Sequence, residues 1–191
     1  MLVIKPYLRE NALMYAARYA FSQNPVFGNF AGIGGNCTNF VSQAILAGSC
    51  TMDYSEPFGW FYISDAERSP SWTGVEFLHD FLVGAGDFTD PNLRAGPYGR
   101  DVRAGQTQIG DVVQLARAGD FYHTLIISGF AEGETLVCAH TNDALDKPLS
   151  SYNFASLRYI HIEGVRVEVE DDNCFTDVFE GISLGLPDSA R

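Results

Sequence analysis

The periodicity of apolar residues changes once along this chain, and that change constrains the fold more than any other feature. In three separate segments of the first 82 residues the apolar side chains recur at helical spacing. From residue 109 onward they follow the shorter period that is typical of strands. Helices first and antiparallel strands after them predict an α+β domain.

The predicted helices lie in the first half of the chain. One runs from about Pro6 to Ser22, with Pro6 in its first turn. A second begins after Asn36 as its N-cap and stops near Gly48, and a third enters at residues 71–76 and continues to Leu82. The strands are predicted at residues 109–115, 122–130, 135–140 and 159–169. We expect residues 84–107 to form a long loop and residues 170–191 an acidic C-terminal extension of a domain that covers residues 1–169.

Composition excludes several classes of partner. A hydrophobic content of 46% indicates a globular core, and a net charge of −12 disfavours nucleic acid, whose phosphates require basic residues. The charge gives no help in binding anionic membranes, and no apolar run is long enough to span a bilayer. The start of the chain lacks a secretory signal. We therefore expect a protein that is cytoplasmic or exported by a route without a cleaved signal.

One cysteine stands where a nucleophile would be expected. Gly34 and Gly35 lead to Asn36 and Cys37, and apolar residues follow at helical spacing. Cys37 thus belongs to the first turn of a helix, where the partial positive charge of the helix end favours a thiolate over a thiol. A partly exposed thiolate on a rigid helix end is suited to nucleophilic catalysis.

Two of the four histidines are placed to assist such a nucleophile. His123 begins the second predicted strand and His140 ends the third, with a short hairpin connection over residues 131–134. A symmetric hairpin about that connection pairs His123 directly with His140, so that one imidazole can orient the other. Asn142 and Asp143 are alternative orienting residues. We expect His79 to be a surface or packing residue and His161 to be structural.

Other residues are weaker candidates for the site. Asn24, in an upstream loop, could donate a hydrogen bond to an oxyanion. Trp60, Tyr62 and Trp72 could line a substrate groove or, equally, pack in the core.

The remaining cysteines, Cys50, Cys138 and Cys174, show no C-x-x-C spacing and are interpreted as buried free thiols. No metal or organic cofactor is expected. A zinc site formed by Cys37, Cys138 and His140 is the competing interpretation of the histidine pair.

These residues together resemble a known family. The sequence is similar to an amidase domain family of the papain-like cysteine peptidase clan, related to the NlpC-type and CHAP cell-wall hydrolases, and the similarity extends over roughly residues 7–163. The matching motifs are Tyr15-Ala16, Tyr19-Ala20, Asn24-Pro25, the run from Gly34 to Gln43, Trp60, the run from Ser71 to Gly74, the run from Gly110 to Gln114, Tyr122-His123-Thr124 and His140-Thr141. The resemblance implies Cys37 as nucleophile, His123 as base and a polar residue on the next strand as orienter.

The predicted activity is hydrolysis of an amide bond through a thioester acyl-enzyme. The resemblance implies the peptide of the bacterial cell wall as substrate. Two alternatives stay open: a protein-directed cysteine peptidase or transglutaminase-like acyl transferase, and a non-catalytic binding module on a hydrolase scaffold.

Overall fold

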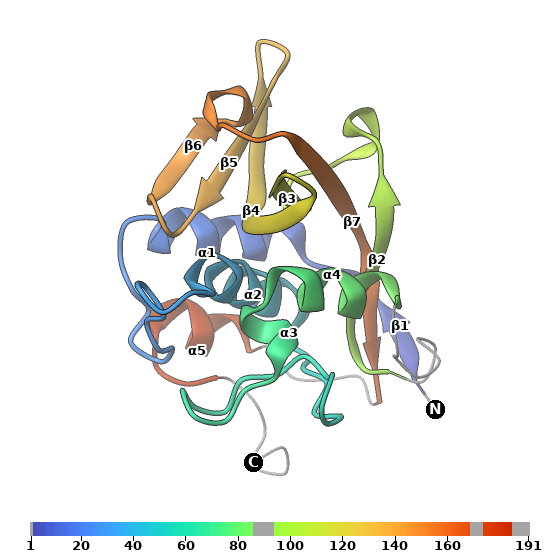
Figure 1. Ribbon diagram of the computed structural model, residues 1–191. Helices are drawn as coiled ribbons and strands as arrows, with labels where there is room; N and C mark the ends of the chain where they lie inside the picture. Colours follow the sequence, from blue (N-terminus) through green and yellow to red (C-terminus); the bar gives the residue numbers. More distant parts are fainter. Residues whose placement is uncertain (1, 86–93, 169–173, 185–191) are drawn as a thin grey trace.

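Helix α2 (Asn36–Ser49) is the central element of the structure, since all 14 of its residues are buried. The computed structural model describes residues 2–85, 94–168 and 174–184. Figure 1 shows α2 among the other helices, on one side of a curved sheet whose β4–β5 hairpin projects beyond them. The expected α+β architecture is therefore confirmed.

The polar side chains of α2 are buried together with their partners. The indole N–H of Trp60 donates to Ser42 Oγ, and that of Trp72 donates to Asn39 Oδ1. The Tyr15 hydroxyl donates to Gln43 Oε1. Because buried polar groups are stable only when they are hydrogen-bonded, these aromatic residues let a partly polar helix occupy the core.

The other helices surround α2, and none in the described part of the chain is both long and apolar enough to cross a membrane. They are α1 (Arg9–Tyr19), α3 (Pro70–Thr73), α4 (Val75–Val83) and α5 (Phe175–Glu180), with 3₁₀ turns η2 (Ala104–Gln106) and η3 (Leu149–Ser151). Helix α1 starts later than predicted because the backbone N–H of Leu8 donates to the carbonyl of Gly48. This contact keeps residues 6–8 extended beside the end of α2.

The helix α2 was predicted to stop near Gly48, but Gly48 lies within its last turn. A Cβ atom at this position would approach Tyr7 Cε2 to 2.5 Å, so only glycine allows the close packing of the N-terminal segment. The helix ends instead at Cys50, which has a φ of 50°.

The sheet contains seven antiparallel strands. Six follow the order β1-β7-β3-β4-β5-β6, and the seventh, β2, also pairs with β7. The strands are β1 (Val3–Lys5), β2 (Gly96–Val102), β3 (Val112–Arg117), β4 (Asp120–Ala131), β5 (Glu134–Ala139), β6 (Ala144–Pro148) and β7 (Ser156–Val167). The four predicted strands correspond to β3, β4, β5 and β7. Strand β2 lies in the segment predicted to be a loop, and β1 and β6 were not predicted, because short strands with Gly, Pro and charged residues lack a clear period.

The sheet separates two apolar clusters. Val112 contributes to the cluster around α2, whereas its neighbour Val113 contributes to a second cluster on the opposite face. This follows from the alternation of side chains along a strand. The second cluster packs against the segment that contains η3, including Tyr152.

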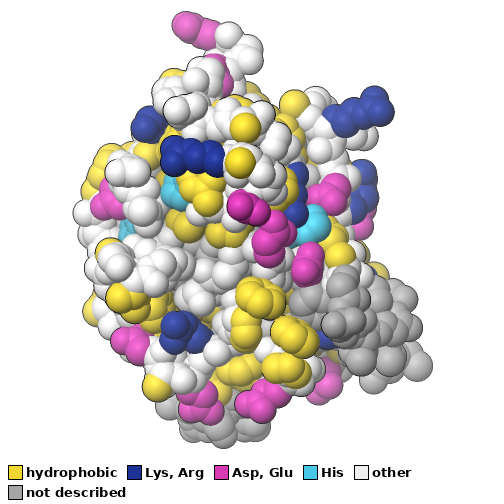
Figure 2. All heavy atoms as spheres, in the orientation of Figure 1, with side chains coloured by type: hydrophobic (Ala, Val, Ile, Leu, Met, Phe, Trp, Pro, Cys, Tyr) yellow, Lys and Arg dark blue, Asp and Glu magenta, His cyan; other side chains and the backbone are white. Residues whose placement is uncertain are grey.

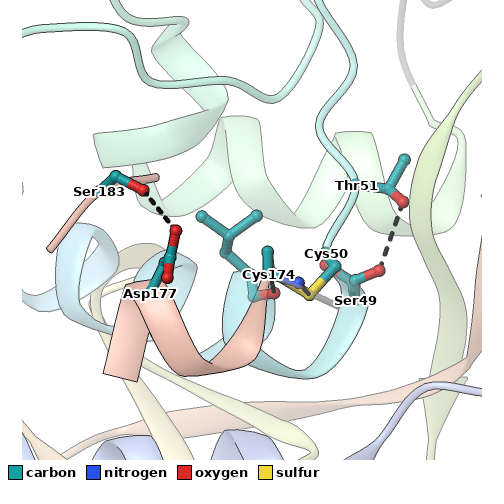
Figure 3. Close-up of a disulfide and its surroundings, with 7 residues drawn as sticks. Ser49, Cys50, Thr51, Cys174, Asp177 and Ser183 are labelled. Atoms are coloured by element: carbon teal, nitrogen blue, oxygen red, sulfur yellow. Dashed lines mark hydrogen bonds between the residues drawn. A yellow bond between two sulfur atoms is a disulfide. The ribbon is translucent and has the colours of Figure 1, made fainter. Parts of the chain in front are cut away.

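A disulfide joins the C-terminal segment to the end of α2. Cys50 and Cys174 are bonded, with their Cα atoms 5.4 Å apart and a sequence separation of 124 (Figure 3). The expectation of buried free thiols is therefore wrong for these two cysteines, and it is confirmed for Cys138. Cys37 is also free, but it is buried, whereas a partly exposed side chain was expected. Within the predicted extension, α5 packs against α2, and its Val178 carbonyl accepts a hydrogen bond from Asn24 Nδ2.

Candidate active site

Cys37 lies in the first turn of α2, as predicted, and its side chain borders a pocket. The chain reaches the helix through Gly34 and Gly35, with φ angles of 90° and 92°. Gly35 could not be replaced by another residue without strain, because its Cβ atom would also lie 2.8 Å from the carbonyl oxygen of Thr73. The two glycines therefore place the start of α2 close to α3.

Asn36 is not the N-cap of α2, in contrast to the prediction. Gly35 occupies that position, and Asn36 is the first helical residue. The Asn36 side chain turns back instead, and its Oδ1 accepts hydrogen bonds from the backbone N–H of Phe30 and from Asn39 Nδ2. It holds the preceding loop against the helix.

One hydrogen bond links the segments that carry Cys37 and His123. Thr38 Oγ1 lies 2.9 Å from Thr124 Oγ1, and both hydroxyls are buried. Thr38 directly follows Cys37, and Thr124 directly follows His123 near the start of β4. The contact therefore brings two residues that are 86 positions apart to the border of the same pocket.

The pocket has a volume of about 680 Å³ and lies between the start of α2, the start of β4 and the segment from β5 to η3. Its residues are Phe30, Gly32, Gly34, Gly35, Asn36, Cys37, Arg117, Tyr122, His123, Thr141, Asn142, Lys147, Ser151, Tyr152 and Asn153. Of the orienting residues considered from sequence, Asn142 lines the pocket, whereas His140 and Asp143 do not.

His123 lies in an environment that disfavours its charged form. Burial lowers the pKa of His123 to about 4, and the positive charges of Lys147 and Arg117 add to this effect. The rings of Tyr122 and Tyr152 each have their centroid 6.0 Å from that of His123. The imidazole is therefore neutral near pH 7, which is the form that can accept a proton.

His140 occupies a different environment from the one predicted. Its Nε2 lies 2.7 Å from the carbonyl oxygen of Tyr19, its Nδ1 lies 3.3 Å from Gln23 Nε2, and its ring stacks on Phe40 at 4.1 Å between centroids. In the described part of the chain, no hydrogen bond joins His140 to His123.

The hairpin register explains this difference. Strands β4 and β5 pair Ala131 with Glu134 across a two-residue turn, and a bulge near Ser128 shifts the ladder so that Ile126 pairs with Cys138. Continued from there, the register places Thr124, not His123, opposite His140. The prediction assumed a longer turn and no bulge.

Four other predicted site residues do not border the pocket. Asn24 uses its amide for hydrogen bonds to Tyr15, Val178 and Val26, so it holds the α5 segment and is not placed to bind an oxyanion. The three aromatic residues expected either to line a groove or to pack in the core are buried in the core around α2. They are Trp60, Tyr62 and Trp72. Their aromatic rings pack on one another, with Trp60 and Trp72 at 4.9 Å between centroids.

Comparison with known proteins identifies the family. Residues 6–162 match the family described as "Putative amidase domain". The chain belongs to this family. The matched region includes Cys37, His123 and His140 and ends before α5. Membership in this family points to an enzyme that hydrolyses amide bonds.

A relative from Bacillus subtilis strain 168, described as the uncharacterized protein YhbB, is 31% identical over 144 residues. The alignment covers 72% of this chain and 42% of the relative. No solved structure matches the chain significantly.

Two further histidines lie outside the pocket. His161 Nδ1 lies 2.8 Å from the fully buried carboxylate of Asp111, which also forms an ion pair with Arg9. This buried network is consistent with the structural role expected for His161. His79 is close to Asp80 and Asp101, which lie on α4 and β2. Among the described residues, the one group of three close potential metal ligands is Glu76, His79 and Asp80, and it does not border the pocket.

Proposed function

We propose that this protein is a cysteine-dependent amidase or peptidase, with Cys37 as nucleophile and His123 as general base and acid. The observation that carries the proposal is the hydrogen bond between Thr38 and Thr124, which holds both candidate catalytic residues at one pocket. Family membership supports amide hydrolysis as the reaction.

The reaction follows from this pair. Neutral His123 accepts the proton of the Cys37 thiol while the sulfur attacks the amide carbonyl carbon. The developing oxyanion accepts a hydrogen bond from the free backbone N–H of Cys37, because the first N–H groups of a helix have no partner within the helix. His123 then donates its proton to the leaving amine, and a thioester remains on Cys37.

Hydrolysis completes the cycle. His123 accepts a proton from water as the water oxygen attacks the thioester carbon, and the carbon–sulfur bond breaks. The products are a carboxylic acid and the free thiol of Cys37. Every proton is transferred by His123, so the proposed mechanism needs no additional cofactor.

We further propose that the domain is a member of the papain-like clan and acts on bacterial cell-wall peptides. A helix that begins at the nucleophile and packs on an antiparallel sheet supports the first part. The disulfide between Cys50 and Cys174 supports the second, because such bonds persist in oxidising compartments outside the cytosol, where the cell wall lies.

Digestion of purified cell wall tests this proposal. The wild-type protein and Cys37→Ala are incubated with the wall, with and without an added amine, and soluble products are identified by mass spectrometry. We expect peptides whose new ends have gained water, only with the wild type. Products that carry the added amine would indicate an acyl transferase, and equal release by Cys37→Ala would rule out the thiol mechanism.

A further inference from the structure

The charged residues that line the pocket, apart from its histidine, are both basic. They are Arg117, at the end of β3, and Lys147, in β6. None of the Asp or Glu residues in the described segments lines the pocket. This is unexpected in a chain with 24 acidic and 12 basic residues. The pocket is lined by positive charge, whereas the net charge of the whole protein is negative.

Each of the two basic side chains lies over an aromatic ring. Arg117 Cζ is 4.5 Å from the centroid of Tyr122, and Lys147 Nζ is 4.4 Å from the centroid of Tyr152. Arg117 Nη2 also lies 3.5 Å from the carbonyl oxygen of Asn153. In Figure 2, a basic side chain lies across hydrophobic side chains and close to a histidine in the region of β6 and η3.

Neither cation is neutralised by a described carboxylate. Arg9, Arg100 and Arg158 each form an ion pair with an Asp or Glu, but Arg117 and Lys147 form none with any carboxylate in residues 2–85, 94–168 or 174–184. Stacking on an aromatic ring holds a cation in position and leaves its N–H donors available to an anion.

The two cations are also close to the candidate catalytic residues. The tyrosines on which they lie are the two whose rings are 6.0 Å from His123. After burial, the positive charges of Lys147 and Arg117 also lower the pKa of His123, in agreement with this proximity. A negative group bound between them would therefore lie beside the amide that Cys37 attacks.

We propose that Arg117 and Lys147 bind a carboxylate of the substrate next to the scissile amide. The enzyme would then select peptides with an acidic group at that position. This inference rests on the proposed function, because it takes the pocket to hold the amide. Charge-assisted hydrogen bonds from Arg and Lys are strong enough to determine such a preference.

Alkylation of Cys37 tests the inference without turnover. Iodoacetate and iodoacetamide transfer similar groups to a thiolate with loss of iodide, but only iodoacetate carries a carboxylate. The measured quantity is the iodoacetate-to-iodoacetamide rate ratio at Cys37, located by mass spectrometry, with glutathione as reference and Cys37→Ala as the background from Cys138. We expect the ratio to exceed that of glutathione by roughly tenfold, the size of one charge-assisted hydrogen bond.

Variants assign the effect to the two cations. Arg117→Met and Lys147→Met should each lower the ratio, and the double variant should return it to that of glutathione. Arg100→Met, which removes a partly exposed cation on β2, is the matched control and should leave the ratio unchanged. A wild-type ratio equal to that of glutathione, a ratio unchanged in the double variant, or a Cys37 that neither reagent modifies would overturn the inference.

Peptide substrates then identify the carboxylate. Matched peptides carry Glu or Gln beside the cleaved bond, each with a free or an amidated C-terminus, and kcat/KM is compared. A preference for Glu assigns a side-chain carboxylate, and a preference for the free C-terminus assigns a terminal one. Cys37-dependent hydrolysis with the same kcat/KM for all four peptides would refute the inference but not the proposed function. Hydrolysis by Cys37→Ala would refute the proposed function itself.

Discussion

The hydroxyl oxygens of Thr38 and Thr124 lie 2.9 Å apart in the core, between the first turn of α2 and the start of β4. Each threonine directly follows a candidate catalytic residue. Thr124 Oγ1 is also 3.4 Å from Gln114 Nε2, so the contact extends into β3. This small polar link joins the two segments that carry Cys37 and His123, both of which border the pocket.

Replacement of either threonine by valine should therefore reduce catalysis. Valine preserves shape but removes the hydroxyl, so we expect Thr38→Val and Thr124→Val to lower kcat about tenfold or more, since small displacements of reacting groups are costly. Each should cost roughly 1–3 kcal/mol of the free energy of unfolding, because the remaining hydroxyl loses a buried partner. Steady-state kinetics and urea denaturation measure the two effects.

The double variant provides the control. With both hydroxyls removed, the loss of stability should be smaller than the sum of the single losses. Additive effects would show that the two hydroxyls act independently and do not position Cys37 and His123.

Cys37→Ala should abolish amide hydrolysis while the protein stays folded, because the side chain borders a pocket and does not belong to the main apolar cluster. Cys138→Ala is the matched control, since Cys138 is also a buried free thiol but is not among the residues that line the pocket. Turnover measurements on both variants test the loss of hydrolysis, and circular dichroism tests whether each variant stays folded. Residual turnover by Cys37→Ala well above background would exclude Cys37 as nucleophile.

The pH dependence of activity should reflect the environment of His123. Because burial and two nearby cations lower its pKa to about 4, the acid limb of kcat/KM should fall near pH 4, well below 6.5. Lys147→Met removes one positive charge and should shift this limb to higher pH. An acid limb near 6.5 that does not respond to Lys147→Met would contradict the assignment of His123 as base.

Stability should change with pH in the same range. The unfolded chain binds a proton at His123 below about pH 6.5, whereas the folded protein does so only near pH 4. The stability associated with neutral His123 is therefore complete above pH 6.5 and is lost as the pH falls toward 4, by about 3 kcal/mol at most. Denaturation of the wild type and of His123→Asn at several pH values isolates the contribution of His123. If the free energy of unfolding changed equally with pH in the two proteins, His123 would not contribute to the pH dependence.

Reduction of the disulfide should destabilise the protein without removing activity. The bond between Cys50 and Cys174 closes a loop of 124 residues, for which the loss of chain entropy predicts a stabilisation of about 4–5 kcal/mol. Neither cysteine borders the pocket, so hydrolysis should persist at low temperature. Thermal denaturation with and without reductant measures the effect.

The variant Cys50→Ala/Cys174→Ala serves as the control, because it should unfold at the same temperature in both conditions. A wild type that shows no shift on reduction would mean that the bond contributes little to stability.

His140→Ala should lower stability and activity together, because His140 contacts the Tyr19 carbonyl and Phe40 and is followed by Thr141 and Asn142, which border the pocket. We expect a loss of about 2–3 kcal/mol and a smaller decrease in rate than for Cys37→Ala. Gln23→Ala, which removes only the Nδ1 contact, should have a weaker effect on both. Loss of activity with a chelator and recovery with zinc would instead indicate a metal site at His140.

The sequence determined those features of the protein that depend on local patterns. Glycines before Cys37 and apolar residues after it specify a helix with the cysteine in its first turn, and alternation after residue 109 specifies the main strands. The α+β class and membership in the amidase family follow from these patterns. Such features rest on contacts between near neighbours, whose geometry is the same in most proteins.

Only the tertiary structure decided which distant residues meet. A two-residue turn and a bulge near Ser128 shift one hairpin and move His140 out of the expected pairing with His123. Trp60 and Trp72 lie in the core because α2 presents buried polar groups that need indole donors. Arg117 and Lys147 reach the pocket from strands that are far apart in sequence, and no local pattern marks them. The physical reason is that register, burial and ion pairing depend on the whole packed chain, so the charge of the pocket becomes visible only when the sheet is complete.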